Sequence, residues 1–420
     1  MKQVPGGVTA PKGFRASGVH CGVKKGKGDG NQPPMSKMPE VLEGKKDLAL
    51  IVSEQPCVAA AVYTMNRVKA APLYVTMDHL ENGEAQGIVA NSGNANACAP
   101  NSHEHAEKMC ELAAAATGLK ASDFVVASTG VIGQELNIAA IERGLPAAAA
   151  ALSADGSDAA ANAIMTTDTV KKELSVTCSI GGKTVTIGAI AKGSGMIHPN
   201  MGTMLAFITT DCAITHEMLE DALREVVAKT FNRVTVDGDT STNDTCVVLA
   251  NGMAGNPLIE WKDEDYETFK AALDHVCRTL SRTIAGDGEG ASRLITCKMV
   301  GARSEESAER LAKAVVGSSL VKAAMFGADA NWGRVLCAMG YSKAPFRPEH
   351  VDVSFQSCAG EILVCKQGEQ VVFDEDKAKE ILSQKEVVIA VSLNEGEESA
   401  ECWGCDLTYD YVKINGDYRT

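Results

Sequence analysis

The chain has 420 residues, of which 45% are hydrophobic and 22% are charged. This composition is ordinary for a soluble globular protein, and the length suits two domains or one large α/β unit. The formal net charge of −14 argues against a nucleic-acid-binding surface, because such a surface needs a basic stripe. The longest apolar runs are too short to cross a membrane.

The N-terminus and the cysteines indicate where the protein works. The opening segment, MKQVPGGVTAPKGF, contains no apolar signal core, so we expect a cytoplasmic protein. The fourteen cysteines are scattered along the chain, which favours reduced thiols over a disulfide framework. Cys402 and Cys405 form one CxxC motif, but a zinc site needs further Cys or His ligands. We therefore expect structural packing there and no metal site.

The first half of the chain predicts strands and one clear helix. Residues 27–46 are rich in Gly, Pro and Lys and predict a mobile surface loop. Two apolar stretches, 47–52 and 57–63, then predict strands of a buried sheet. Residues 102–117 predict a helix that ends at Gly118. Residues 174–187 alternate around Gly181 and Gly182, which predicts a hairpin with a two-residue turn.

Helical signals strengthen after residue 210. Apolar residues recur at helical spacing over 218–227 and 269–284, and residues 304–316 predict a third helix. Short apolar strands at 246–250 and 386–392 lie between these helices. The mixture indicates an α/β fold with sheets covered by helices, and we place its natural division near residue 202.

One segment, residues 192–211 (KGSGMIHPNMGTMLAFITTD), combines small residues with a single Thr203 before an apolar run. Glycines allow the sharp turn that would precede Thr203. A threonine hydroxyl becomes a useful nucleophile when a base lies beside it, and a free α-amine with a pKa near ~8 is such a base. A cut between Gly202 and Thr203 would create that amine. Composition alone favours the plainer interpretation, a tight turn before a buried strand.

Longer motifs favour the processing site over the tight turn. The whole chain, from VPGGVTAPKGF to DLTYDYVKINGDYRT, resembles the bifunctional glutamate N-acetyltransferase/ornithine acetyltransferase family of arginine biosynthesis. The matching blocks between these ends are ANSGNANAC (90–98), STGVIG (128–133), MTTDT (165–169), DGDTSTND (237–244), DGEGAS (287–292) and NWGR (331–334).

The resemblance implies a fold, a processing event and a reaction. The fold is a four-layer α/β/β/α arrangement of stacked sheets between helix layers, of the self-processing N-terminal-nucleophile type. Cleavage between Gly202 and Thr203 gives an α chain of residues 1–202 and a β chain of residues 203–420, which assemble as α2β2. Thr203 then accepts the acetyl group of N2-acetyl-L-ornithine and passes it to L-glutamate, with no tightly bound cofactor. The residues leave open whether acetyl-CoA also serves as a donor.

The resemblance also assigns roles to residues outside the processing site. Thr129 and Gly130 form the oxyanion hole, where a hydroxyl and a backbone N–H point at a developing alkoxide. The substrate contacts fall on Thr166, Lys192, Thr203, Glu289, Asn415 and Thr420. Lys192 suits a carboxylate, Glu289 suits an ammonium group, and the amide of Asn415 offers both a donor and an acceptor. Apolar, β-prone residues among the last twelve positions predict a final strand.

Two other functions compete with acetyl transfer. A self-processing aminopeptidase or amidase of related fold would use the same nucleophile but admit water to the acyl-enzyme. A cytosolic amino-acid-binding protein would never cleave and would run as one intact chain. The substrate-side matches at Thr166, Lys192, Glu289 and Asn415 favour the transferase.

Overall fold

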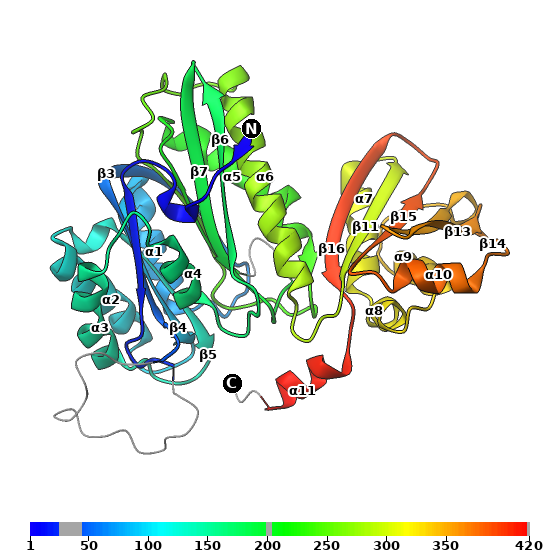
Figure 1. Cartoon of the computed structure of the whole chain (residues 1–420), viewed down its shortest axis with the longest axis horizontal. Coiled ribbons are helices and arrows are strands. Elements are labelled where there is room, and N and C mark those ends of the chain that lie inside the picture. Colours follow the sequence, from blue (N-terminus) through cyan, green and yellow to red (C-terminus); the bar gives the residue numbers. More distant parts are fainter. Residues whose placement is uncertain (25–43, 199–203, 418–420) are drawn as a thin grey trace.

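The computed structural model describes residues 1–24, 44–198 and 204–417. The predicted loop at 27–46 lies mainly outside these residues, as do Gly202, Thr203 and Thr420. Two units make up the described chain, each built on one mixed β-sheet (Figure 1). No helix in the described ranges is both long and apolar enough to cross a membrane.

The first unit is built on a nine-stranded sheet with the order β1-β6-β7-β8-β10-β3-β4-β5, in which β2 pairs with β3. Its strands are β1 (Lys2–Gln3), β2 (Phe14–Val19), β3 (Leu48–Tyr63), β4 (Glu84–Asn94), β5 (Phe124–Val131), β6 (Lys172–Ile180), β7 (Lys183–Lys192), β8 (Leu205–Thr210) and β10 (Thr245–Ala250). Its helices are α1 (Ala71–His79), α2 (Ser102–Thr117), α3 (Ile138–Ala150), α4 (Ser157–Ile164), α5 (His216–Lys229) and α6 (Glu264–Gly286).

The long strand β3 explains how this sheet forms two layers. In its first half, Leu48 and Leu50 pack with residues of α2 and α3, whereas Ala49 and Ile51 face an inner core that also holds residues of β7, β8 and β10. In its second half, Ala60 packs in a third core with α5 and α6. Alternate residues of a strand point to opposite faces. The layers therefore run helices, sheet, sheet, helices, which confirms the predicted four-layer α/β/β/α fold.

The second unit is built on a seven-stranded sheet with the order β14-β13-β12-β15-β11-β16-β9. Its strands are β9 (Val234–Thr235), β11 (Leu294–Ala302), β12 (Asp352–Ser357), β13 (Gly360–Lys366), β14 (Glu369–Gln370), β15 (Glu386–Ser392) and β16 (Glu398–Cys405). Its helices are α7 (Glu305–Gly317), α8 (Ser319–Phe326), α9 (Trp332–Gly340) and α10 (Glu375–Leu382). They share one core with the sheet.

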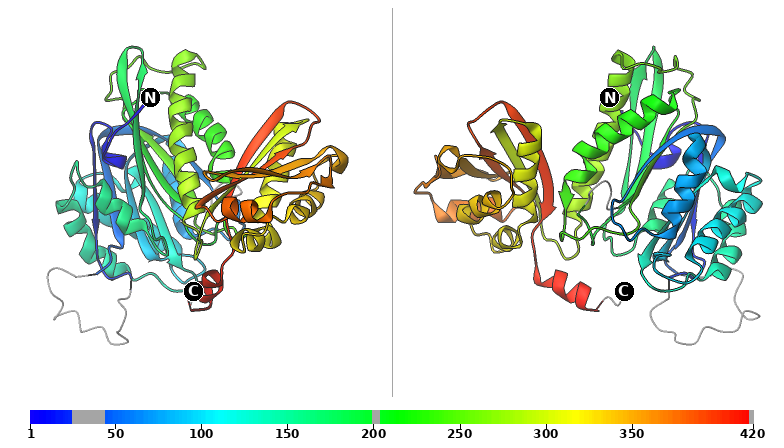
Figure 2. Two further views of the ribbon diagram at one scale, coloured as in Figure 1. Left: turned by 45° about the vertical axis from the view of Figure 1, so that its right-hand side comes forward. Right: turned by 180° about the vertical axis from the view of Figure 1, so that it is seen from behind.

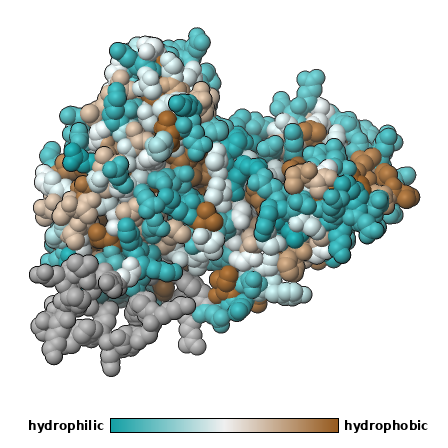
Figure 3. Space-filling view, viewed as in Figure 1, coloured by the Kyte–Doolittle hydropathy of each residue, from teal (hydrophilic) through white to brown (hydrophobic). Residues whose placement is uncertain are grey.

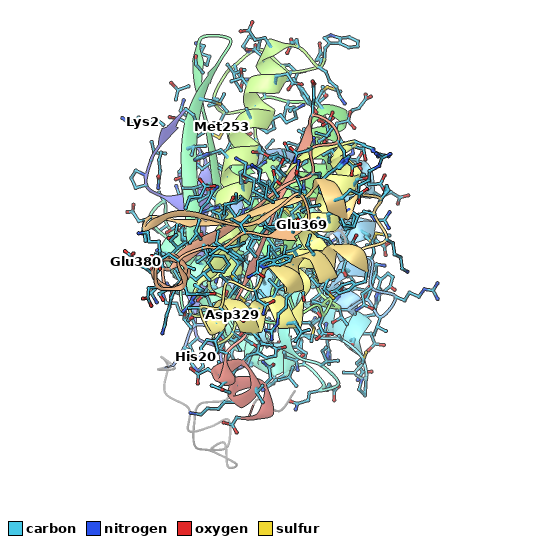
Figure 4. All side chains as sticks on the ribbon, turned by 90° about the vertical axis from the view of Figure 1, so that its right-hand side faces the viewer. Lys2, His20, Met253, Asp329, Glu369 and Glu380 are labelled. Carbon is cyan, nitrogen blue, oxygen red and sulfur yellow. The ribbon has the colours of Figure 1, made fainter. Side chains whose placement is uncertain are left out.

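The second unit has an outer end that is exposed to solvent and a side that packs against the first unit. Figure 4 views this end directly, with the exposed Glu369 of β14 and Glu380 of α10 among many polar side chains. Figure 3 shows a hydrophobic area at the outer tip of the second unit. Leu363 of β13 and Val372, just after β14, are large apolar residues that are exposed in this unit. The side that packs against the first unit shares a hydrophobic cluster with it, in which Trp403 of β16 lies with Leu280 and Ile284 of α6.

Several expected elements are confirmed. The helix α2 spans the predicted residues and ends at Gly118, whose φ of +79° is the left-handed cap expected of glycine. The hairpin of β6 and β7 turns at Gly181 and Gly182, both at positive φ. The helices α5, α6 and α7 and the strands β10 and β15 also form at their predicted positions.

Two expectations differ from the structure. Stretches 47–52 and 57–63 belong to one strand, because residues 53–56 between them stay extended at a register shift, with Ser53 buried and the next three residues exposed. The predicted final strand is instead the helix α11 (Tyr409–Asp417), which meets no sheet edge and has no buried residue. Strands β7 and β8, on either side of the predicted division at residue 202, are hydrogen-bonded to each other in one sheet. The second sheet takes β9 from before α6 and its other strands from after α6.

Candidate active site

One polar cavity of about 100 Å³ collects the predicted site residues that the structure describes. It lies where strands of the first unit end, and α11 reaches it from the second unit (Figure 2). The predicted residues that line it are Thr129, Gly130, Thr166, Lys192, Glu289 and Asn415. These positions span almost 300 residues of sequence, so only the folded chain brings them together.

Thr129 and Gly130 come from the end of β5, beside β4. Gly130 has a φ of +136° and pairs with Gly93 across the two strands. A Cβ at residue 130 would lie 2.3 Å from the carbonyl carbon of Gly93, so no larger residue fits at this position. This close backbone approach sets the end of β5 against β4, and the buried Thr129 lies next to it.

Lys192 ends β7 and is 8% exposed. Its Nζ donates a hydrogen bond to Oγ1 of Thr129 at 3.3 Å. The Thr129 oxygen therefore acts as an acceptor from the ammonium group, and its own O–H is left to donate to another partner. Lys192 also pairs with Leu205 of β8, two residues after Thr203 in the chain. The start of β8 thus lies beside the cavity.

A buried charged network supports this side of the cavity. Lys172 lies between Asp168 at 2.7 Å and Asp287 at 2.5 Å. Asp168 also accepts hydrogen bonds from the backbone N–H groups of Thr166 and Gly193 at 3.0 and 2.7 Å. Burial raises the pKa of Asp168, but the positive charges of Lys192 and Lys172 outweigh it and lower the pKa to about 2. Asp168 is therefore a carboxylate that fixes the backbone at Thr166 and at Gly193.

Glu289 and Asn415 form another side of the cavity. Nδ2 of Asn415, on α11, donates to Oε2 of Glu289 at 2.8 Å. Glu289 reaches the cavity past Gly195, where a Cβ would lie 2.3 Å from the Glu289 carboxyl carbon. The glycine is therefore needed for this approach. Asn415 reaches the cavity from a helix and not from the predicted strand.

The structure adds residues that sequence reasoning did not select. Ser241, Thr242 and Asn243 line the cavity, and Asp168 supports it from behind. A signal was available for all four, because they belong to the blocks DGDTSTND and MTTDT. Their individual roles depend on contacts that no linear pattern shows. The predicted residues Gly202, Thr203 and Thr420 lie outside the described residues.

The cavity defines a class of enzyme. A hydroxyl and a backbone N–H at Thr129 and Gly130 suit a developing oxyanion. One ammonium and one carboxylate, from Lys192 and Glu289, suit a substrate that carries both charges, such as an amino acid. Together with the four-layer fold, these features are typical of an acyl-transfer enzyme that acts on amino acids.

Comparison with known proteins makes this assignment specific. The model of the ArgJ family matches residues 36–420. The arginine biosynthesis bifunctional protein ArgJ of Symbiobacterium thermophilum is 52% identical over 421 aligned positions, which cover 100% of both chains. The chain therefore belongs to the ArgJ family, and it is an acyltransferase of arginine biosynthesis.

Two solved structures of related proteins also match. The arginine biosynthesis bifunctional protein ArgJ of Bacillus halodurans is 46% identical, with a TM-score of 0.49, over 51% of this chain and 100% of the solved chain. The ornithine acetyltransferase of Mycobacterium tuberculosis, solved with ornithine, is 36% identical, with a TM-score of 0.39, over 47% of this chain and 98% of the solved chain.

Proposed function

We propose that the chain transfers an acetyl group from N2-acetyl-L-ornithine to L-glutamate through an acetyl ester on Thr203. The observation that carries this proposal is the single cavity lined by Thr129, Gly130, Lys192, Glu289 and Asn415. Family membership over the full length of the chain supports transfer rather than hydrolysis.

The reaction takes two steps that balance without water. Thr203 Oγ attacks the acetyl carbonyl of acetylornithine, the C–N bond breaks, and ornithine leaves with the hydroxyl proton on its nitrogen. The α-amine of glutamate then attacks the acetyl ester, the C–O bond breaks, and a proton returns to Thr203 Oγ. The α-amine of Thr203 carries the proton in each direction, because its pKa lies near ~8.

The cavity residues stabilise the oxyanion and bind the substrates. The Thr129 hydroxyl and the Gly130 N–H stabilise the tetrahedral oxyanion of each step. Lys192 and Glu289 hold the charged groups of the amino acid, together with Thr166. Asn415 accommodates either the side-chain ammonium of ornithine or the carboxylate of glutamate, because an amide can accept or donate a hydrogen bond. We assign Thr420 to the same substrate site.

The free amine of Thr203 requires a processing step. We propose that the chain cuts itself between Gly202 and Thr203 to give chains 1–202 and 203–420, and that two of each assemble. Acetyl-CoA is proposed as a second donor, in line with the bifunctional character of the family. A reducing, cytoplasmic setting fits the fourteen cysteines, all of which are free.

The test measures both the lengths of the purified chains and the products of the acetyl-transfer reaction. Purified protein should run as two fragments under denaturing conditions, and the second should begin Thr-Met-Leu-Ala. With acetylornithine and glutamate, ornithine and N-acetylglutamate should form in equal amounts, and acetate should stay negligible. Acetate as the main product would favour the hydrolase. A parallel assay with acetyl-CoA and glutamate decides whether there is a second donor. An intact chain that still transfers acetyl groups would exclude the free-amine mechanism.

A further inference from the structure

The side chain of Asn243 ties the start of β10 to the end of β5. Its Nδ2 donates to the backbone oxygen of Ala95 at 2.6 Å and to that of Ser128 at 2.8 Å. Its Oδ1 accepts from the hydroxyl of Thr242 at 2.6 Å. Asn243 is 5% exposed, so all of these bonds lie in a buried environment where a lost partner is costly.

The carbonyls of Ala95 and Ser128 fix the backbone on either side of Thr129 and Gly130, the two residues proposed to face the oxyanion. The carbonyl of Ser128 belongs to the peptide that leads into Thr129. The backbone N–H of Ala95 donates to the carbonyl of Val131 at 2.9 Å, just after Gly130. The Asn243 amide therefore holds the backbone before Thr129 directly. It holds the backbone after Gly130 through Ala95.

The sheet order shows why this link is needed. Strands β3 and β4 lie between β10 and β5 in the sheet, so no backbone ladder joins the two. The folding of the sheet brings their ends together at the cavity, and Asn243 bridges them. β10 also borders β8, so Asn243 connects the strand end that follows Thr203 to the proposed oxyanion donors.

We propose that Asn243 is a positioning residue for the oxyanion hole. Its side chain holds Thr129 and Gly130 at the distance that transition-state stabilisation requires. This inference rests on the proposed function. Asn243 touches no reacting atom in this account and acts through the backbone of β5. A displacement of about 1 Å in such a site can cost roughly 10²-fold in rate.

Asn243→Asp tests the inference with little change in shape. The carboxylate keeps the acceptor for Thr242 but faces the carbonyl oxygens of Ala95 and Ser128, to which it cannot donate while ionised. We expect kcat per cleaved chain to fall about 10- to 100-fold and KM to change less than about threefold. Asn243→Ala, which removes both donors without adding charge, should lower kcat in the same range and serves if the aspartate variant does not fold.

Asn256 provides a matched control. It is 6% exposed and its Nδ2 donates to the backbone oxygens of Ala213 and Pro257 at 3.1 and 2.7 Å, away from the cavity. Asn256→Asp should lower the melting temperature as Asn243→Asp does but leave kcat unchanged. An equal loss of kcat in both variants, or an unchanged kcat in both Asn243 variants, overturns the inference.

A double-mutant cycle separates this inference from the function it rests on. Because Asn243 positions both Thr129 and Gly130, Asn243→Asp should cost less in a Thr129→Ala background than in the wild type, where only the part that acts through Gly130 remains, so the two losses multiply incompletely. Fully multiplicative losses would show that Asn243 acts elsewhere. An unchanged kcat in Thr129→Ala alone would instead remove Thr129 from the proposed oxyanion hole, whatever Asn243 does.

Discussion

The two sides of the cavity are built in different ways. One side, the strand wall, consists of Thr129, Lys192 and Asn243 at the ends of buried strands, each at most 8% exposed. The other side, the tail wall, consists of Glu289 and of Asn415 on α11. All residues of α11 are described, and none is buried. An edge-to-face contact at 5.6 Å between the rings of Tyr409 and Phe326 holds the start of the helix, and the hydrogen bond from Asn415 to Glu289 holds its end.

This difference separates two requirements of the reaction. Donors that stabilise an oxyanion work best when they need no rearrangement, so a rigid strand wall suits them. A site that receives acetylornithine and then glutamate must exchange substrates, and a loosely packed chain end suits that exchange. We therefore expect changes in the strand wall to lower kcat and changes in the tail wall to raise KM.

The largest effect should come from the proposed nucleophile, Thr203. Thr203→Ala should remain one chain of 420 residues and lose acetyl transfer completely, because both the hydroxyl and the new amine are missing. Electrophoresis and a transfer assay measure this. Thr215→Ala removes the hydroxyl that caps α5 and is a control, which should cost about 1 kcal/mol of stability but cleave and transfer normally. Residual transfer by Thr203→Ala would assign the acetyl acceptor elsewhere.

The next effect concerns the oxyanion donors. Thr129→Ala removes one donor, so kcat should fall by roughly 10²–10³. KM should change far less, because the hydrogen bond strengthens mainly in the transition state. Steady-state kinetics on the cleaved enzyme measure both constants. A large rise in KM with an unchanged kcat would make Thr129 a ground-state contact and would break the division between the two walls.

Removal of the tail wall should affect binding more than folding. Deletion of residues 415–420 should raise KM for the amino acids sharply and leave the melting temperature nearly unchanged, since α11 contributes no buried residue. Calorimetry and kinetics test this together. Val412→Ala, at a residue that is 68% exposed, is the control and should change neither. A deletion variant with normal kcat/KM would show that the tail only covers the protein.

The smallest effect is a pH dependence of stability that belongs to the strand wall. The pKa of Asp168 falls from 3.8 to about 2 on folding, so its charged form stabilises the native state. That stabilisation, about 2 kcal/mol, is complete above pH 3.8 and is lost as the pH falls through 2. Denaturant titrations between pH 2 and pH 5 should show this slope in the wild type. Asp168→Asn should have a shallower slope, because only the contribution of this carboxylate is lost, and an identical slope in the variant would contradict the assignment.

Much of the fold could be predicted from the sequence because its signals are local. Gly118 ends α2 through its left-handed backbone, and six apolar residues at helical spacing face the core from α5. The errors arose where distant contacts decide. The β-prone residues of α11 meet no sheet edge, so a helix, which satisfies its own backbone, forms there instead. The continuity of β3 depends on its neighbours β2 and β4, which the sequence of β3 does not reveal.

The site was predictable only in part, for a related reason. Thr129, Lys192 and Glu289 carry recognisable chemistry and lie in recognisable blocks, so resemblance could select them. The partners that hold them are set by long-range geometry. Asn243 meets Ser128 across 115 positions of sequence, and residue spacing gives no measure of such a contact.

The sheet that surrounds the proposed cut has a consequence for how the protein unfolds. Strands β7 and β8 lie on either side of Gly202–Thr203 and share a hydrogen-bonded ladder from Ile187 to Lys192. A protein cut there is a two-chain complex whose halves fold only together. Its refolding becomes a second-order reaction, and its unfolding midpoint rises with protein concentration. The uncut Thr203→Ala chain unfolds as a single molecule, with a midpoint independent of concentration.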